Sequence, residues 1–169
     1  SYIQAPEWIK RRIINIQNKD NNCFEYSLVA CIDLPDKNRE RVSNYQNKNL
    51  FNFKDIDFPA KICSKTFETF EKNNPKYNLS VYQVNVKSSS MSDVLPFYNN
   101  SEETTKQNLK LLVLYNDQGQ KHYTAITDFN KFCGTQDGKN KTRTCDLCLH
   151  RFSGTNCEYN LEEHKKFCR

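Results

Sequence analysis

Apolar and polar positions divide the first half of the chain into short segments with different periodicities. The β-branched run at 13–17 predicts a strand, and the polar residues after it predict a turn. From Cys23 to Ile32 the apolar residues recur at helical spacing behind polar capping residues, which predicts a buried helix. Further on, we expect an extended segment at 53–59 and an amphipathic helix at 63–72, which a proline-containing turn ends.

Alternating apolar positions in the second half predict strands instead of helices. Three main strands and one weaker edge piece are expected, at 79–84, 109–115, 122–126 and 94–98. A tight turn joins the last two main strands into a hairpin. One early helix followed by several strands, without βαβ alternation, predicts an α+β fold. The expected organisation is a core at 1–133, a linker at 134–143 and a separate small unit at 144–169.

Composition indicates a folded chain without a membrane-spanning helix. Of the 169 residues, 37% are apolar and 12% are aromatic, which argues against disorder. No apolar run approaches roughly 18 residues, so no membrane partner is expected. The four glycines fit neither a Rossmann nor a P-loop pattern, which argues against those kinds of nucleotide binding. The net charge of +5 is mild, whereas nucleic-acid binders usually carry a denser basic stripe.

The eight cysteines are placed in a way that argues against a disulfide framework. Four are scattered singly through the core: Cys23, Cys31, Cys63 and Cys133. The other four crowd into the tail: Cys145, Cys148, Cys157 and Cys168. This distribution predicts free thiols in the core, a metal site in the tail and an intracellular protein, cytoplasmic or nuclear.

The spacing of cysteine and histidine in the tail is typical of a zinc finger. The four expected ligands are Cys145, Cys148, His164 and Cys168. The first two suit a hairpin knuckle, and the last two lie one helical turn apart on one face of a helix. With Phe152 and Leu161 between the pairs, the order matches a ββα finger with a longer central loop. We expect one structural Zn²⁺ here, and we expect neither His150 nor Cys157 to bind it.

The expected helix of the finger is poorly suited to reading DNA. Its recognition positions hold Glu158, Tyr159 and Asn160, so arginine and lysine are absent where base contacts would form. Lys165 and Lys166 could contact phosphate. Nucleic acid is therefore a weak candidate partner, and packing on the core or binding a protein is favoured.

Cys23 and His122 form the arrangement that thiol catalysis needs. A catalytic thiol needs its proton removed by an imidazole within reach, and a helix N-terminus favours the thiolate. Cys23 opens the expected buried helix, and His122 begins a later strand. Asp128 is our first choice for orienting the histidine, and Asn130 is the second. The simpler alternative is that Cys23 is a small core residue.

An oxyanion site for this chemistry can be built from the residues just before the helix. Gln17 lies six positions before Cys23, a spacing at which thiol proteases place an oxyanion-hole glutamine. Asn18 could do the same work. The backbone N–H of Cys23 would be the second donor.

These segments resemble known cysteine peptidases. Asp20-Asn21-Asn22-Cys23-Phe24 resembles the nucleophile block of ovarian-tumour (OTU-like) deubiquitinases, and His122-Tyr123 resembles their His–aromatic strand. Longer stretches resemble proteins encoded by invertebrate transposable elements: 14–27, 41–45, 58–59, 70–74 with 79–82, and 122–129. The resemblance implies a papain-like cysteine peptidase fold, related to OTU-like and herpesvirus-tegument-type deubiquitinases. In that fold the helix that carries Cys23 packs on an antiparallel sheet.

The resemblance also implies a substrate. A deubiquitinase must admit the narrow Gly-Gly tail of ubiquitin, and Tyr123 beside the histidine would wall such a channel. The alternative is that Tyr123 is a core aromatic of its strand. Asp20, in the nucleophile block, is expected to contribute to the substrate site. Ubiquitin or its chains are therefore the expected partner. Two alternatives remain open: a protease that processes a transposon polyprotein, and an inactive peptidase-fold binding module whose finger contacts DNA or protein.

Overall fold

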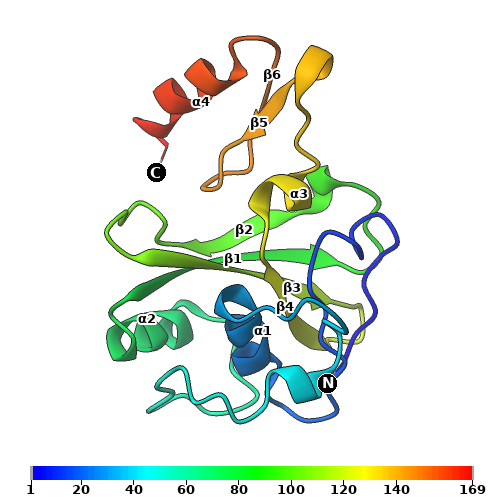
Figure 1. Cartoon of the computed structure of the whole chain (residues 1–169), viewed down its shortest axis with the longest axis vertical. Coiled ribbons are helices and arrows are strands. Elements are labelled where there is room, and N and C mark those ends of the chain that lie inside the picture. The colour runs from blue at the N-terminus through cyan, green and yellow to red at the C-terminus, as the bar shows by residue number, and fades with distance from the viewer. Residues whose placement is uncertain (1, 169) are drawn as a thin grey trace.

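A mixed four-stranded sheet forms the centre of the fold, with helices on both of its faces (Figure 1). The structure is a computed structural model that describes residues 2–168. The core elements, in chain order, are α1 (Cys23–Ile32), η1 (Val42–Asn44), α2 (Ser64–Asn73), β1 (Tyr77–Asn85), η2 (Met91–Asp93), β2 (Leu95–Asn99), β3 (Gln107–Tyr115), β4 (Lys121–Ile126) and α3 (Phe129–Cys133). The predicted α+β class, both predicted helices and the three main strands are confirmed.

The strand order β2-β1-β3-β4 contains one pairing that the expected antiparallel sheet lacks. β1 and β3 run parallel, in register from Tyr77 opposite Gln107 to Asn85 opposite Tyr115. The other two pairings are antiparallel. The parallel pair arises because the chain reverses into β2 at the edge, reverses again, and then places β3 on the far side of β1. The expectation of a purely antiparallel sheet was therefore wrong.

Side chains of the strands alternate between two apolar layers, one on each face of the sheet. The face covered by α1 and α2 buries aromatic and aliphatic groups: Phe24, Phe67, Phe70, Leu79, Val81, Leu111, Val113 and Tyr123. The opposite face is covered by α3 and the N-terminal segment and buries Ile9, Tyr82, Val84, Leu112, Leu114, Ile126 and Phe132. Neighbouring residues of β4 therefore belong to different layers, with Tyr123 in the first and His122 facing the second.

The outer edge of β4 is covered by two segments from the start of the chain. Ile14 forms a bridge with Ala125, with N–H···O distances of 2.8 and 3.0 Å. The strand predicted at 13–17 is thus reduced to a single bridge. Farther along this edge, side chains of α1 take the place of a neighbouring strand. The Cys23 sulfur accepts the N–H of Tyr123, and the Ser27 hydroxyl donates to the Tyr123 carbonyl. The start of α1 is thereby fixed to the backbone of β4 at the residue after His122.

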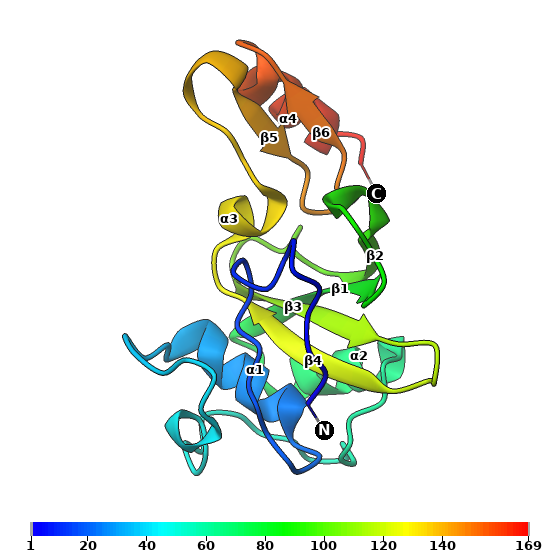
Figure 2. The same cartoon turned by 90° about the vertical axis from the view of Figure 1, so that its right-hand side faces the viewer.

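The tail lies beyond α3, on the far side of the sheet from α1 and α2 (Figure 2). It contains η3 (Gly138–Asn140), β5 (Thr142–Thr144), β6 (Arg151–Ser153) and α4 (Cys157–Lys165), with β5 and β6 antiparallel. This is the predicted ββα order, although β5 starts inside the segment expected to be a linker. Within residues 2–168, none of the helices combines the length and apolarity that crossing a bilayer requires.

Candidate functional site

Cys23 lies at the first position of α1 and is almost fully buried, with 6% of its surface exposed. Its Sγ accepts a hydrogen bond from the N–H of Tyr123 at 3.4 Å, and Tyr123 directly follows His122 in β4. The helix starts here because the Tyr26 N–H donates to the Asn22 carbonyl at 3.0 Å and closes the first turn. The positive end of the helix dipole is thus directed at the Cys23 sulfur.

Burial of Cys23 opposes the stabilisation of its thiolate by the helix dipole. Desolvation raises the pKa of the thiol, and the hydrogen bond from the Tyr123 N–H only partly opposes that effect. The resting side chain is therefore a protonated thiol at neutral pH. Chemistry at this sulfur then requires a base that removes the proton as the new bond forms.

His122 is fully buried, and Asn15 fixes its protonation pattern. The ring Nε2 lies 2.8 Å from Oδ1 of Asn15. The amide of Asn15 is oriented by its other end, because Nδ2 donates to the carbonyl of Ile3 at 2.8 Å. Oδ1 can only accept a hydrogen bond, so Nε2 must carry the proton, and Nδ1 is the basic nitrogen of the neutral ring.

Asp128, our first choice for orienting His122, lies in a different environment. It is exposed, and its carboxylate caps α3 by accepting the N–H of Lys131 at 3.1 Å. The second choice, Asn130, bonds the hydroxyl of Thr135. The structure brings Asn15 to the histidine instead. Sequence reasoning missed Asn15 because its contact depends on the bridge between Ile14 and β4, which no local spacing reveals.

Neither side chain proposed for the oxyanion site is found in that role. Asn18 is buried, and its Nδ2 donates to the backbone carbonyl and to Oδ1 of Asp20, each at 3.0 Å. Gln17 has an exposed side chain and lines a different hollow from the one that Cys23 faces. The first turn of α1 supplies the remaining donors, because the opening N–H groups of a helix have no intrahelical partner.

Asp20 braces the loop before Cys23. Its Oδ1 accepts the N–H of Asn22 at 3.0 Å, and its Oδ2 accepts the hydroxyl of Tyr26 at 2.6 Å. Burial alone would raise the pKa of Asp20, but the hydrogen bonds from Tyr26, Asn18 and Asn22 outweigh it and lower that pKa. The structure thus places Asp20 in the support of the helix start, where the resemblance implied a part of the substrate site.

Because its folded pKa is lowered, Asp20 stabilises the fold above its unfolded pKa of about 3.9, and this contribution is lost as pH falls through the folded value. We expect Asp20→Asn to lower the urea midpoint at pH 7 and to match the wild type near pH 2. Chemical unfolding at both pH values measures this. The exposed Asp36→Asn serves as the matched control, and a deficit of Asp20→Asn that persists in acid would contradict the expectation.

Cys23 faces a pocket of 480 Å³ between β4 and the loop that precedes α2. Its lining residues are Asn21, Cys23, Pro59, Ala60, Lys61, Ile62, Cys63, Gly119, Lys121 and Tyr123. The hydroxyl of Tyr123 donates to the carbonyl of Ala60 at 3.1 Å and approaches that of Lys61 at 3.3 Å. Tyr123 therefore ties the loop to β4 and forms one wall, as a channel-lining aromatic would.

A second thiol, Cys63, lines the same pocket at the start of α2. The Thr66 hydroxyl, 3.3 Å from its sulfur, and the Thr66 N–H lower the pKa of Cys63. Burial instead raises the pKa of both Cys31 and Cys133 to about 12.

We expect iodoacetamide at pH 7.5 to alkylate Cys63 at least about 10-fold faster than Cys31 or Cys133, because only the thiolate reacts. Peptide mapping by mass spectrometry measures the rates, and equal rates would contradict the assignment.

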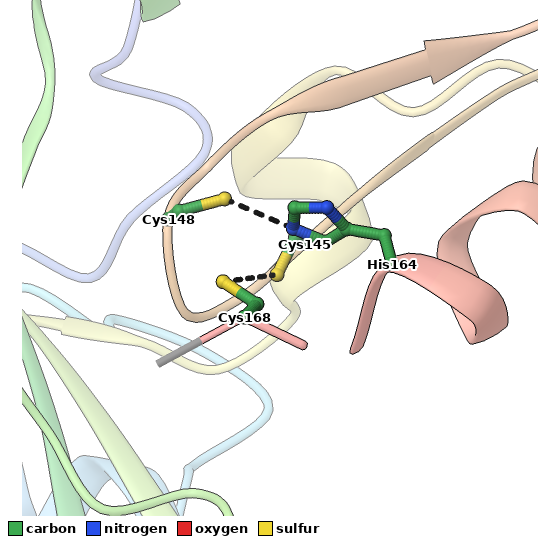
Figure 3. Close-up of side chains that lie close together, drawn as sticks. All are labelled: Cys145, Cys148, His164 and Cys168. Atoms are coloured by element: carbon green, nitrogen blue, oxygen red, sulfur yellow. Dashed lines mark hydrogen bonds between the residues drawn. The ribbon is translucent and has the colours of Figure 1, made fainter. Parts of the chain in front are cut away.

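Four side chains of the tail converge in the way a metal ion requires (Figure 3). The cluster consists of Cys145, Cys148, His164 and Cys168, whose ligand atoms all lie within 4.8 Å of one another. The Cys145 and Cys168 sulfurs are 3.9 Å apart, and the Cys148 sulfur is 3.3 Å from Nε2 of His164. A tetrahedral zinc with Zn–S bonds of about 2.3 Å places its sulfurs about 3.8 Å apart. The predicted clustering is confirmed, and its dimensions fit one ion.

The two spare candidates remain outside this cluster. Cys157 is buried at the start of α4, and the ring of His150 packs against Phe152, with centroids 4.6 Å apart. The backbone instead shapes the knuckle, since the Cys145 N–H donates to the His150 carbonyl at 2.9 Å. Among the described residues, the group that could hold a metal ion is thus the predicted set of four.

The described residues therefore contain two candidate sites: a buried thiol bonded to the backbone N–H of the residue after His122, and four side chains that could hold a metal ion. No family model, curated protein or solved structure matches this chain.

Asp146, between two of the metal ligands, attaches the tail to the core. Its backbone carbonyl accepts hydrogen bonds from the hydroxyl of Tyr82 and from Nδ2 of Asn99, the latter at 2.7 Å. Its carboxylate pairs with Lys110 of β3 at 3.0 Å, and both side chains are largely buried. The metal knuckle is thus bonded to three neighbouring strands of the core, so the tail and the sheet are mechanically connected.

Proposed function

We propose that this protein is a thiol-dependent peptidase in which Cys23 is the nucleophile and His122 the general base and acid. The observation that carries the proposal is the position of Cys23 at a helix start, facing a pocket and bonded to the residue after His122. The tautomer set by Asn15 adds to it, because it makes Nδ1 the nitrogen that can take a proton. A core cysteine with only a packing role needs none of these features.

In the proposed reaction, Sγ of Cys23 attacks the scissile carbonyl carbon while its proton moves to Nδ1 of His122. The C–N bond then breaks as the imidazolium returns that proton to the leaving amine, which leaves a thioester on Cys23. Water, deprotonated by His122, hydrolyses the thioester and regenerates the thiol. The raised pKa of Cys23 suits this sequence, in which proton removal accompanies attack.

We assign the oxyanion to the first turn of α1. The backbone N–H of Cys23 points out of the helix start, and the dipole of α1 adds positive potential there. The Asn18 amide already donates to Asp20, so Asn18 contributes by shaping the loop. Gln17 lines a different hollow from Cys23, so the proposed donors are the backbone N–H groups of the first turn.

The substrate we propose is ubiquitin, cut after its C-terminal Gly-Gly. A pocket of 480 Å³ with Tyr123 and the 59–63 loop as walls suits a narrow chain end better than a bulky side chain. Hydrolysis of a fluorogenic amide at the ubiquitin C-terminus tests this choice. Release of the fluorophore supports it. Cleavage only of peptides from a polyprotein junction would favour the processing protease, and no cleavage of either would favour the binding module.

We propose that the metal in the tail is a structural Zn²⁺. All four ligands come from the protein, so no coordination position is open for substrate. None of the eight cysteines forms a disulfide, which fits the reducing interior of a cell, cytoplasmic or nuclear.

The charges of the finger favour a protein contact over DNA. Glu158, at a recognition position, pairs with Lys141 at 2.6 Å and with Arg143 at 3.0 Å. Lys165 and Lys166 likewise have acidic partners in Asp146 and Glu163. The basic side chains that could contact phosphate are therefore neutralised within the tail, and Tyr159 is left 66% exposed.

A further inference from the structure

The segment that opens the chain lies over the buried face of His122. We call residues 2–9 the N-terminal strap; Figure 2 shows it in dark blue beside β4. Ala5 and Ile9 anchor it in the apolar layer on that face of the sheet. Nε1 of Trp8 adds a hydrogen bond to the hydroxyl of Ser88 at 3.1 Å. The strap is therefore anchored to the fold at Ala5, Trp8 and Ile9.

Its first two described residues contact the histidine and the amide that orients it. The ring of Tyr2 meets the ring of His122 edge to face, with centroids 5.8 Å apart and planes at 73°. The carbonyl of Ile3 accepts Nδ2 of Asn15 at 2.8 Å. One contact restrains the plane of the imidazole, and the other restrains the amide that bonds its Nε2.

The Ile3 carbonyl matters because an asparagine amide can bind a histidine in either of two orientations. If Oδ1 of the amide faces the ring, Nε2 must carry the proton and donate it. If Nδ2 faces the ring, Nε2 must be unprotonated to accept, and the proton of the neutral ring is then on Nδ1. A backbone carbonyl only accepts hydrogen bonds, so it holds Nδ2 on its own side. The proton position on His122 thus depends on a backbone atom of the strap.

We propose that the strap is a positioning element for the proposed catalytic base: Tyr2 and Ile3 hold Asn15 and His122 so that Nδ1 is the proton acceptor toward Cys23. Only the expected effect of the strap on the rate of peptide cleavage rests on the proposed peptidase function. The tautomer is a property of the folded protein and is measured independently of activity.

The test weakens the strap in the full chain by the double substitution Tyr2→Ala and Ile3→Gly. These changes remove the ring contact and the Ile3 side chain that packs on the apolar layer. Long-range ¹H–¹⁵N spectra report the tautomer of each histidine, and His122→Gln identifies its signals among the three histidines. We expect the wild type to show Nε2–H alone, and the strap variant to show a mixture with Nδ1–H. The control Glu7→Ala changes an exposed strap residue whose carboxylate pairs with Lys10, and it should preserve the wild-type pattern.

A second substitution separates positioning from general weakening of the fold. In N15D the carboxylate accepts through either oxygen, so no contact with Ile3 is needed to present an acceptor to Nε2. We expect the strap substitutions to lower kcat/KM about 10²-fold in the Asn15 background and less than about 3-fold in the N15D background. Equal losses in both backgrounds, or an unchanged His122 tautomer in the strap variant, would overturn the inference. A normal tautomer response in a chain without any peptidase activity would instead refute only the proposed function.

Discussion

Replacing Cys23 with alanine is expected to lower kcat/KM for peptide cleavage by at least about 10⁴-fold, because the proposed thioester forms on the Cys23 sulfur. The fold should survive, since the change removes one sulfur from a small side chain that makes a single hydrogen bond. His122→Ala should lower kcat/KM by a similar factor, because Cys23 and His122 act in the same step and removing either one abolishes that step. Steady-state kinetics on a ubiquitin C-terminal amide, with circular dichroism as the folding control, measure both effects.

Cys63→Ser provides the matched control for that experiment. Cys63 lines the same pocket and is the thiol whose pKa is lowered, so a reagent or substrate could react there instead. We expect Cys63→Ser to keep kcat/KM within about 3-fold of the wild type. Loss of turnover in Cys63→Ser with retention in Cys23→Ala would exchange the roles of the two thiols and contradict the proposed reaction.

Loss of the metal should have the second large effect, and it should reach beyond the tail. Structural zinc contributes roughly 10–16 kcal/mol of binding free energy to small fingers, so Cys148→Ser should leave β5, β6 and α4 unfolded. Asp146 would then release Tyr82 and Asn99 of the sheet. Two lost hydrogen bonds of about 1 kcal/mol each should lower the Tm of the core by about 5 °C.

Metal analysis and calorimetry measure these two results. The wild type should carry one zinc per chain, and Cys148→Ser none, whereas Cys157→Ala should retain the metal because Cys157 lies outside the cluster. Retention of zinc by Cys148→Ser would show that the ligand set is wrong. A core Tm that is unchanged after metal loss would show that the Asp146 contacts do not couple the tail to the sheet.

Local patterns predicted the parts of the molecule that local forces build. The helix from Cys23 to Ile32 follows from a polar turn and an apolar run, and its bounds agree with the structure. The metal ligands were predicted because a knuckle spacing and a helical spacing each bring two ligands together within a few residues. Such features need no knowledge of distant contacts.

The contacts that decide the chemistry depend on pairings far apart in the sequence, and these were not predictable. The parallel pairing of β1 with β3 follows from where β2 is placed, which periodicity does not show. Asn15 reaches His122 only because Ile14 pairs with Ala125 across the outer edge of β4. Asp128 was chosen for its position along the same strand, but the chain turns after β4 and uses that carboxylate to cap α3.

The most direct test of the account uses a ubiquitin probe that carries a thiol-reactive group in place of its C-terminal carboxylate. Zinc-loaded wild type, Cys23→Ala and Cys63→Ser are incubated with the probe, and their intact masses are measured. The account predicts a single ubiquitin-sized adduct on the wild type and on Cys63→Ser, and none on Cys23→Ala. A folded wild type that forms no adduct, or an adduct that persists in Cys23→Ala, would contradict it.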